Sequence, residues 1–274
     1  MRSPFWMLFL AALVFALVEM TVTFVLARRW RNYGIVDVVW SGGFALIALL
    51  GLTLSWGSPD AAHGARLRGV LLAGMVVIWS LRLAVHLGIR VASHHPGEDV
   101  RYAQLRREWG DSTSRRMFGF YQLQGVLQAA LAAPFLIVFA SSGTPGSSLG
   151  TFEGLGISLW LAGILGESIA DRQLARFRAD PSRRGRVCQE GLWNWSRHPN
   201  YFFEWLVWVG YAVFALAVPW GWAGLISPLL MGHFLVNVTG IPMTEALSVK
   251  SKGDAYREYQ RTTSAFIPWF KRTG

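Results

Sequence analysis

The sequence lacks most of the features that define familiar soluble enzymes. It has one cysteine, Cys188, in 274 residues, so neither a disulfide framework nor a cysteine-based metal cluster is expected. It contains no G-x-G-x-x-G fingerprint, no G-x-x-x-x-G-K-[ST] phosphate loop and no H-E-x-x-H zinc motif. We therefore expect no metal site and no Rossmann or P-loop domain. Any nucleotide would have to be held by the helices and loops of the chain itself.

Charge is also scarce, because only 15% of the residues are charged and 53% are hydrophobic, whereas soluble domains carry about 25% charged residues. A helix that crosses a bilayer needs about 20 largely apolar residues. Seven stretches meet this requirement: 5–27, 35–54, 67–91, 118–140, 149–170, 202–218 and 220–241. The sequence therefore predicts an all-α integral membrane protein, with a single domain of seven transmembrane helices over residues 1–274.

The distribution of basic residues predicts the orientation of these helices. With the N-terminus outside, the inner connections are 28–34, 92–117, 171–201 and 242–274, and they hold 21 of the 26 Lys and Arg residues. Cytoplasmic loops of membrane proteins carry such an excess. The net charge of +10 is thus explained by topology and by contact with anionic lipid headgroups, without a nucleic-acid partner. We expect a cytoplasmic C-terminus and a working polar surface on the cytoplasmic side.

Several ionisable residues lie within the predicted spans, where they are costly and often functional. Arg82 and His86 are spaced i, i+4 in the third span, and Asp37 lies near the inner end of the second. We expect Asp37 to pair with Arg82, either as a structural ion pair or as part of a site. In the seventh span, His233 and Asn237 are also spaced i, i+4, with Glu245 beyond them.

The inner connections hold a second group of polar residues. Glu167, Asp171 and Arg178 follow one another along the inner end of the fifth span, and a spacing of seven residues returns to the same helix face. The run Arg197-His198-Pro199-Asn200-Tyr201 precedes Glu204 at the start of the sixth span. Pro199 suits the first turn of that helix. Carboxylates, an amide and guanidinium groups in this arrangement can orient ribose hydroxyls and phosphates.

These motifs resemble the membrane steroid 5-alpha-reductase family, and more closely its uncharacterised bacterial branch. The resemblance is carried by GESIADRQLARFR from Gly166, GLWNWSRHPNYFFEWLVWVGYA from Gly191 and GIPMTEALSVKSKGDAYREYQRTTSAFIPWF from Gly240, together with NYGIVDVVWSGGF from Asn32 and GEDVRYAQLRREWG from Gly97. It implies a cofactor-binding half over roughly 166–274 that holds NADPH, a lipid-like substrate entering from the bilayer, and a bacterial inner (plasma) membrane location.

The resemblance also implies roles for individual residues. The predicted cofactor contacts are Glu167, Asp171, Arg178, Arg197, His198, Asn200, Tyr201, Glu204, Asn237, Glu245, Tyr256 and Tyr259. Steroid reductases place a Gln-Glu pair on the second helix and a Tyr on the third, whereas this chain offers Asp37 there and Arg82 and His86 on the third. We expect His86, or Arg82 with Asp37, to polarise the carbonyl group of the substrate.

The expected reaction is hydride transfer from NADPH to the carbon–carbon double bond of a steroid-like or isoprenoid enone. Two alternatives remain open at this stage. One is a membrane methyltransferase that uses S-adenosylmethionine, because isoprenylcysteine methyltransferases have a similar His-Pro-x-Tyr…Glu segment. The other is a non-catalytic lipid-binding or transport protein. The sequence predicts neither the lipid nor the oligomeric state.

Overall fold

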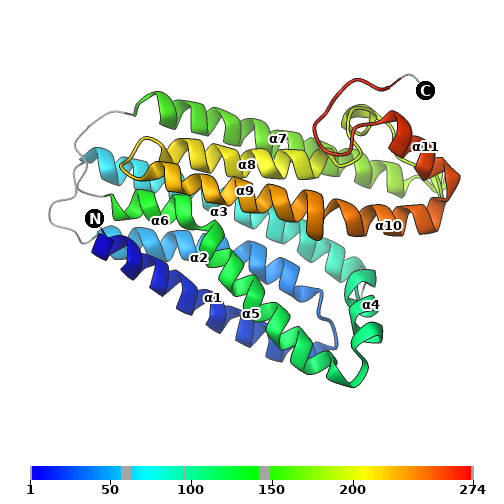
Figure 1. Cartoon of the computed structure of the whole chain (residues 1–274), viewed down its shortest axis with the longest axis horizontal. Helices are drawn as coiled ribbons and strands as arrows, with labels where there is room; N and C mark the ends of the chain where they lie inside the picture. The colour runs from blue at the N-terminus through cyan, green and yellow to red at the C-terminus, as the bar shows by residue number, and fades with distance from the viewer. Residues whose placement is uncertain (1, 57–62, 95–96, 142–148, 273–274) are drawn as a thin grey trace. The chain divides into compact units, whose positions relative to one another are not determined.

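The computed structural model describes residues 2–56, 63–94, 97–141 and 149–272. These residues form helices and turns, together with one isolated parallel bridge between Ser196 and Ser264. The long helices are α1 (Arg2–Trp30), α2 (Ile35–Trp56), α3 (His63–His94), α5 (Thr113–Leu131), α7 (Thr151–Ala179) and α8 (Pro199–Ala215). The shorter ones are α4 (Val100–Trp109), α6 (Ala133–Ala140), α9 (Ile226–His233), α10 (Ile241–Lys252) and α11 (Asp254–Thr262) (Figure 1).

The fold is that of an all-α integral membrane protein. Five segments are long and apolar enough to cross a bilayer: Pro4–Trp30, Ile35–Trp56, Gly64–Ser93, Thr151–Ala179 and Gly221–Lys252. A sixth is added if Val100–Leu131 and Ala133–Ala140, which meet at a bend of 45°, are one broken span. Helix α8 covers the remaining predicted span, but its 17 residues reach only about 25 Å. The predicted count of seven is therefore not confirmed, and the N-terminus-outside orientation stays a prediction.

The chain divides into two compact units. The first comprises 1–150 and 218–224, and the second comprises 151–217 and 225–274. The predicted cofactor-binding half, 166–274, therefore falls in the second unit except for the segment 218–224. The predictions for Asp37, Arg82 and His86 fall in the first unit.

In the first unit, α1 packs against α2 and α5, and α2 packs against α3 (Figure 1). The close contact of α1 with α5 depends on Gly125, where an added Cβ would lie 3.1 Å from the carbonyl oxygen of Ala16. Pro134 lies in the first turn of α6, directly after the bend. Proline cannot donate the backbone hydrogen bond that would continue the preceding helix, which accounts for the bend.

In the second unit, α7 and α8 lie side by side along their length (Figure 1). Small residues make this approach possible, as in many membrane helix pairs. A Cβ at Gly163 would lie 2.8 Å from the backbone nitrogen of Val207, and one at Gly210 would lie 2.7 Å from that of Trp160. Helix α9 packs against α8 and continues through a π-helical turn, Phe234–Val238, toward α10.

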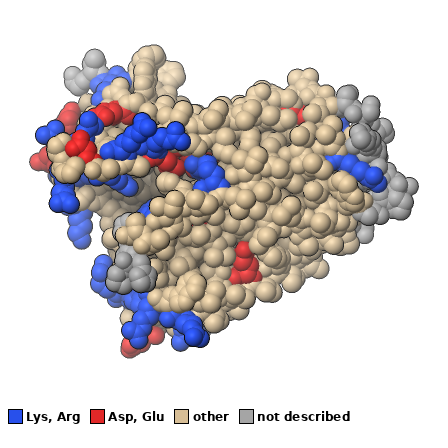
Figure 2. Space-filling model, turned by 180° about the vertical axis from the view of Figure 1, so that it is seen from behind, with Lys and Arg blue, Asp and Glu red and all other residues tan. Residues whose placement is uncertain are grey.

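The outer surface of the helices is apolar. On α1, Val14, Val18 and Val22 are 53–57% exposed, a pattern that suits lipid rather than water. In Figure 2 most of the Lys and Arg lie at the left of the view, and the wide area beside them consists mostly of uncharged side chains.

Candidate functional site

The start of α8 is joined to the C-terminal tail by backbone hydrogen bonds. The backbone nitrogen of Arg197 donates to the carbonyl oxygen of Ser264 (2.8 Å), and that of Trp269 donates to Trp195 (2.9 Å). The Ser196 hydroxyl donates to the carbonyl oxygen of Phe266 (2.8 Å). Because Pro199 occupies the first turn of α8, the helix starts directly after this junction. The junction thus fixes where the polar residues of the His198–Glu204 segment lie.

Glu245 on α10 lies at the centre of a buried polar network. Its carboxylate accepts hydrogen bonds from Arg197 Nε (2.6 Å) and Gln260 Nε2 (2.7 Å), and it contacts His198 Nε2 at 3.2 Å. The side chains of Arg197 and Glu245 are only 10% and 14% exposed. Arg197 Nη1 also donates to the carbonyl oxygen of Thr263 (2.6 Å). The network therefore ties α10, α11, the tail and the start of α8 together.

Three tyrosines surround this network. The Tyr259 hydroxyl donates to the carbonyl oxygens of Trp193 and, at 3.1 Å, Ser196, and burial raises its pKa. Burial, followed by the negative charge of Glu245, raises the pKa of Tyr256 to about 12. The Tyr201 ring stacks on that of His198, and its hydroxyl lies 3.1 Å from Thr244 Oγ1. The two shifted phenols, Tyr256 and Tyr259, thus stay protonated at neutral pH.

Asn200 and Glu204 occupy the first turns of α8. Glu204 is 8% exposed, and its Oε1 accepts a hydrogen bond from Trp208 Nε1 (3.1 Å). Asn200 Oδ1 is buried and has no hydrogen-bond partner among the described residues. A buried amide oxygen without a partner is costly, so Asn200 has an acceptor to offer to a ligand that carries N–H or O–H groups.

The other predicted contacts of the second unit lie on α7 and at the end of α9. Glu167, Asp171 and Arg178 are spaced along α7, and Glu167 is 4% exposed. His233 and Asn237 are brought together, with Asn237 Nδ2 at 3.4 Å from His233 Nδ1. The i, i+4 spacing therefore correctly predicted that His233 and Asn237 are neighbours.

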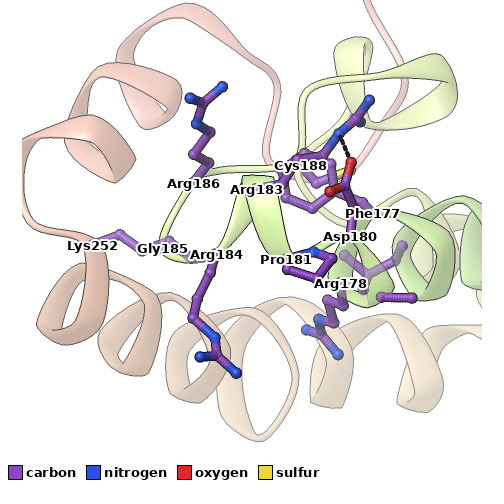
Figure 3. Close-up of a pocket in the computed structure, with 12 residues that line it drawn as sticks. Phe177, Arg178, Asp180, Pro181, Arg183, Arg184, Gly185, Arg186, Cys188 and Lys252 are labelled. Carbon is purple, nitrogen blue, oxygen red and sulfur yellow. Dashed lines mark ion pairs between the residues drawn. The ribbon is translucent and has the colours of Figure 1, made fainter.

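A basic cavity of about 310 Å³ lies where α7 passes into the following loop. It is lined by Leu174, Phe177, Arg178, Ala179, Asp180, Pro181, Arg183, Arg184, Gly185, Arg186, Cys188 and Lys252. The lining thus contains four arginines, one lysine and one carboxylate. Figure 3 shows Arg178 and Arg184 extending to the same side of the loop and Arg186 to the other.

Part of the charge of this cavity is available for a ligand. Arg183 pairs with Asp180 (2.9 Å) and with Glu190, whereas Arg184 and Arg186 have no ion pair or hydrogen bond from their guanidinium groups to any described residue. Cys188 is buried, and burial raises the pKa of its thiol, so the thiol is not poised for chemistry. The arrangement suits a ligand with several negative charges.

The sequence carries a partial signal for this cavity. The arginine-rich segment 172–186 suits the phosphates of NADPH, and Arg178 is its individually predicted cofactor contact. Between Arg184 and Arg186, Gly185 adopts a positive φ of 81°, which favours glycine. Lys252 comes from α10, more than 60 residues away, and no local pattern indicates its place.

In the first unit, the structure gives Asp37 different partners from the predicted Arg82. Its carboxylate accepts hydrogen bonds from Arg101 Nη2 (2.6 Å) and from the Tyr102 hydroxyl (2.6 Å). Arg101 also bonds to Asp99. The prediction failed because it considered only neighbouring spans, whereas the short helix α4 folds back and carries its own arginine to Asp37. Arg82 and His86 lie one turn apart on α3, as predicted.

The comparisons with known proteins give one family and two relatives. The model of the family described as "Protein of unknown function (DUF1295)" matches residues 23–263. "Uncharacterized protein C594.04c" of Schizosaccharomyces pombe is 25% identical over 228 residues, which cover 73% of this chain and 63% of that protein. "Steroid 5-alpha-reductase DET2" of Arabidopsis thaliana is 30% identical over 117 residues, 42% of this chain and 40% of that protein.

The matched segments span less than two thirds of either relative. No solved structure matches the chain. Neither relative has the name of a methyltransferase, so the expected C-terminal similarity to isoprenylcysteine methyltransferases is not shown.

Proposed function

We propose that this chain, which belongs to the DUF1295 family, the steroid 5-alpha-reductase-like family, is a membrane-embedded NADPH-dependent reductase. Its substrate would be a steroid-like or isoprenoid lipid with a carbon–carbon double bond conjugated to a carbonyl group. The similarity to a plant steroid 5-alpha-reductase supports a reductase, and steroid 5-alpha-reductases use NADPH.

The observation that carries the proposal is the basic cavity between Phe177 and Cys188. NADPH bears a diphosphate and a further phosphate on its adenosine ribose, and arginine binds phosphate through paired N–H groups. A cavity with five cations and one carboxylate fits such a ligand. S-adenosylmethionine has a positive sulfonium and no phosphate, so the same cavity does not suit it.

Within the second unit, some residues would bind the cofactor through charge and others through hydrogen bonds. Arg178, Arg184 and Arg186 would neutralise phosphate oxygens. The unpartnered Oδ1 of Asn200 would accept a hydrogen bond from a hydroxyl or amide group. When bound, the cofactor supplies the hydride, and the protein orients both reactants and stabilises the charge that develops on the carbonyl oxygen. On the substrate side, His86 stays the proposed group that polarises the carbonyl, because Asp37 is paired with Arg101 and Tyr102 and not with Arg82.

A ligand-binding experiment tests the proposal without any knowledge of the substrate. The detergent-purified protein is titrated with NADPH, NADH and S-adenosylmethionine, and its thermal unfolding is followed. A ligand at 100 times its dissociation constant stabilises the folded state by about 2.7 kcal/mol. We expect stabilisation by NADPH, weaker stabilisation by NADH and none by S-adenosylmethionine. Stabilisation by S-adenosylmethionine alone would instead support methyl transfer.

Variants of the cavity sharpen the test. In Arg184→Gln with Arg186→Gln, two phosphate ligands are lost, and we expect the dissociation constant of NADPH to rise at least tenfold, or about 1.4 kcal/mol. The matched control is Arg257→Gln, since Arg257 is an exposed arginine paired with Asp254 on α11 and does not line the cavity. Equal affinity for NADPH in the double variant and the control would show that the cavity does not bind the cofactor.

A further inference from the structure

A second polar site lies within the membrane-spanning part of the first unit. Glu19 is near the middle of the α1 span, Pro4–Trp30, and it meets Gln128 of α5. Each residue lies one turn from the close contact of Ala16 with Gly125, which brings the two helices together. Helix α2 leaves space for them at Gly43, where a Cβ would lie 2.2 Å from Glu19 Oε2 and 2.3 Å from Gln128 Nε2. Three helices therefore enclose the pair.

Two acceptor atoms of this pair have no hydrogen-bond donor among the described residues. Gln128 Nε2 donates to the carbonyl oxygen of Trp40 (2.7 Å), which fixes the orientation of the amide. Gln128 is fully buried. Glu19 Oε2 and Gln128 Oε1 are buried and have no hydrogen-bond partner among the described residues. Within hydrocarbon such atoms are costly, so the site calls for a hydrogen-bond donor.

The position of Glu19 and Gln128 indicates which kind of molecule supplies the hydrogen-bond donor. Glu19 is partly exposed, and its neighbours Val18 and Val22 are 57% and 54% exposed on the apolar surface of α1. The site therefore borders the lipid-facing side of the unit. It lies about 16 Å or more from either end of the span, at a rise of 1.5 Å per residue, which is too deep for a charged headgroup at the membrane surface.

We propose that Glu19 and Gln128 form the polar end of a lipid-binding site that opens to the bilayer and binds the hydroxyl group of a neutral lipid, such as a sterol-like or isoprenoid alcohol. The hydroxyl donates its hydrogen to one of the two open acceptors, and the apolar remainder lies along α1. Identifying this lipid with the substrate rests on the proposed reductase function and requires a hydroxyl group in addition to the enone carbonyl, whereas the demand for a donor comes from Glu19 and Gln128 alone.

The test compares lipids that differ in one functional group. The protein in lipid nanodiscs is titrated, without NADPH, with cholesterol, cholestanone and cholestane, and with geranylgeraniol, its aldehyde and its parent hydrocarbon, and thermal stabilisation reports the affinity. In the wild type we expect at least one alcohol to bind about three- to tenfold more tightly than its hydrocarbon and its carbonyl analogue, the range of one net hydrogen bond. No advantage for either alcohol, or a preference for the carbonyl compound, overturns the proposal.

Variants assign the preference to the pair. Glu19→Leu and Gln128→Leu should remove the preference for the alcohol, and Glu19→Gln, which keeps the size and adds a donor, should move it toward the carbonyl compound. The matched control is Gln122→Leu, because Gln122 also joins α5 to α1, through Thr21 at 3.2 Å, but on an exposed face. If both leucine variants keep the preference, or if the control loses it, the hydroxyl is bound elsewhere and the proposal is wrong.

The outcomes also separate this site from the proposed cofactor site. Absence of an alcohol preference in the wild-type protein, with NADPH binding intact, would refute only the role of Glu19 and Gln128. Absence of NADPH binding with a retained alcohol preference would refute only the reductase.

Discussion

Replacement of Glu245 by alanine should destabilise the second unit strongly. The change removes the acceptor of hydrogen bonds from Arg197 and Gln260 and leaves the guanidinium of Arg197, which is only 10% exposed, without a counter-charge. Breaking a buried ion pair from one side costs about 3–5 kcal/mol. Arg197 keeps hydrogen bonds to the carbonyl oxygens of Gln260 (2.9 Å) and Thr263 (2.6 Å), so we expect the lower end, about 3 kcal/mol.

Thermal unfolding in detergent, followed by tryptophan fluorescence, measures this effect. At about 2–4 °C per kcal/mol for a chain of this size, the melting temperature should fall by about 6–12 °C. The matched control is Glu258→Ala, because Glu258 forms an exposed ion pair with Arg261 on α11, and such pairs contribute about 0–1 kcal/mol. A fall for Glu245→Ala no larger than that of the control would refute the structural role and leave Glu245 free to bind a ligand.

A double variant separates lost charge balance from lost packing. In Arg197→Met with Glu245→Leu both charges are absent, and well-packed apolar replacements of a buried pair are often neutral or stabilising. We expect the double variant to recover most of the stability that Glu245→Ala loses. The result bears on function, since both residues were predicted as cofactor contacts. A residue with a purely structural role should change stability first and cofactor affinity only as a consequence.

Two further predictions concern the second unit. Burial raises the pKa of the Cys188 thiol, so little of the reactive thiolate forms at pH 7.5. Maleimide labelling of Cys188 should therefore be slow in the native protein and complete after denaturation. Rapid labelling of the native protein would contradict the burial of Cys188. Gly163→Val should destabilise the contact between α7 and α8 by about 1–3 kcal/mol, as measured by thermal unfolding. Gly154→Ala, where an added Cβ meets nothing within 4 Å, should not lower stability, because alanine favours a helix more than glycine does. A melting temperature for Gly163→Val no lower than that of the wild type would show that the two helices are not closely packed.

The apolar helices were the most predictable part of the fold. The expected spans 35–54 and 67–91 lie within α2 (Ile35–Trp56) and α3 (His63–His94). The reason is that a continuous apolar stretch has one low-energy arrangement in lipid, a helix whose backbone groups are all bonded internally. The bend within the expected span 118–140 falls next to Pro134, which a proline rule could have located.

Contacts between distant segments could not be predicted in this way. The partner of Asp37 depends on where α4 lies, and Arg101 is 64 residues away. Similarly, Lys252 joins the basic cavity only because α10 returns to the end of α7. Glu19 was missed for another reason: the rule that ionisable residues in a span are significant applies to it directly, but the site depends on Gln128 and on the absent side chain of Gly43, which no local spacing reveals.

The basic cavity and the Glu245 network depend on the same loop, and this connection favours a built binding site over a chance cluster of surface arginines. The loop that carries Arg183–Arg186 is held at its far end by Trp193, whose indole nitrogen donates to the carbonyl oxygen of Ala170 (3.0 Å). The backbone nitrogen of Leu192 donates to Gln173 Oε1 (2.9 Å), and Tyr259 donates to Trp193. Fixing these backbone positions in advance lowers the entropy that a ligand must lose on binding. Loosening the network at Glu245 should therefore weaken anion binding in the cavity even though Glu245 does not line it.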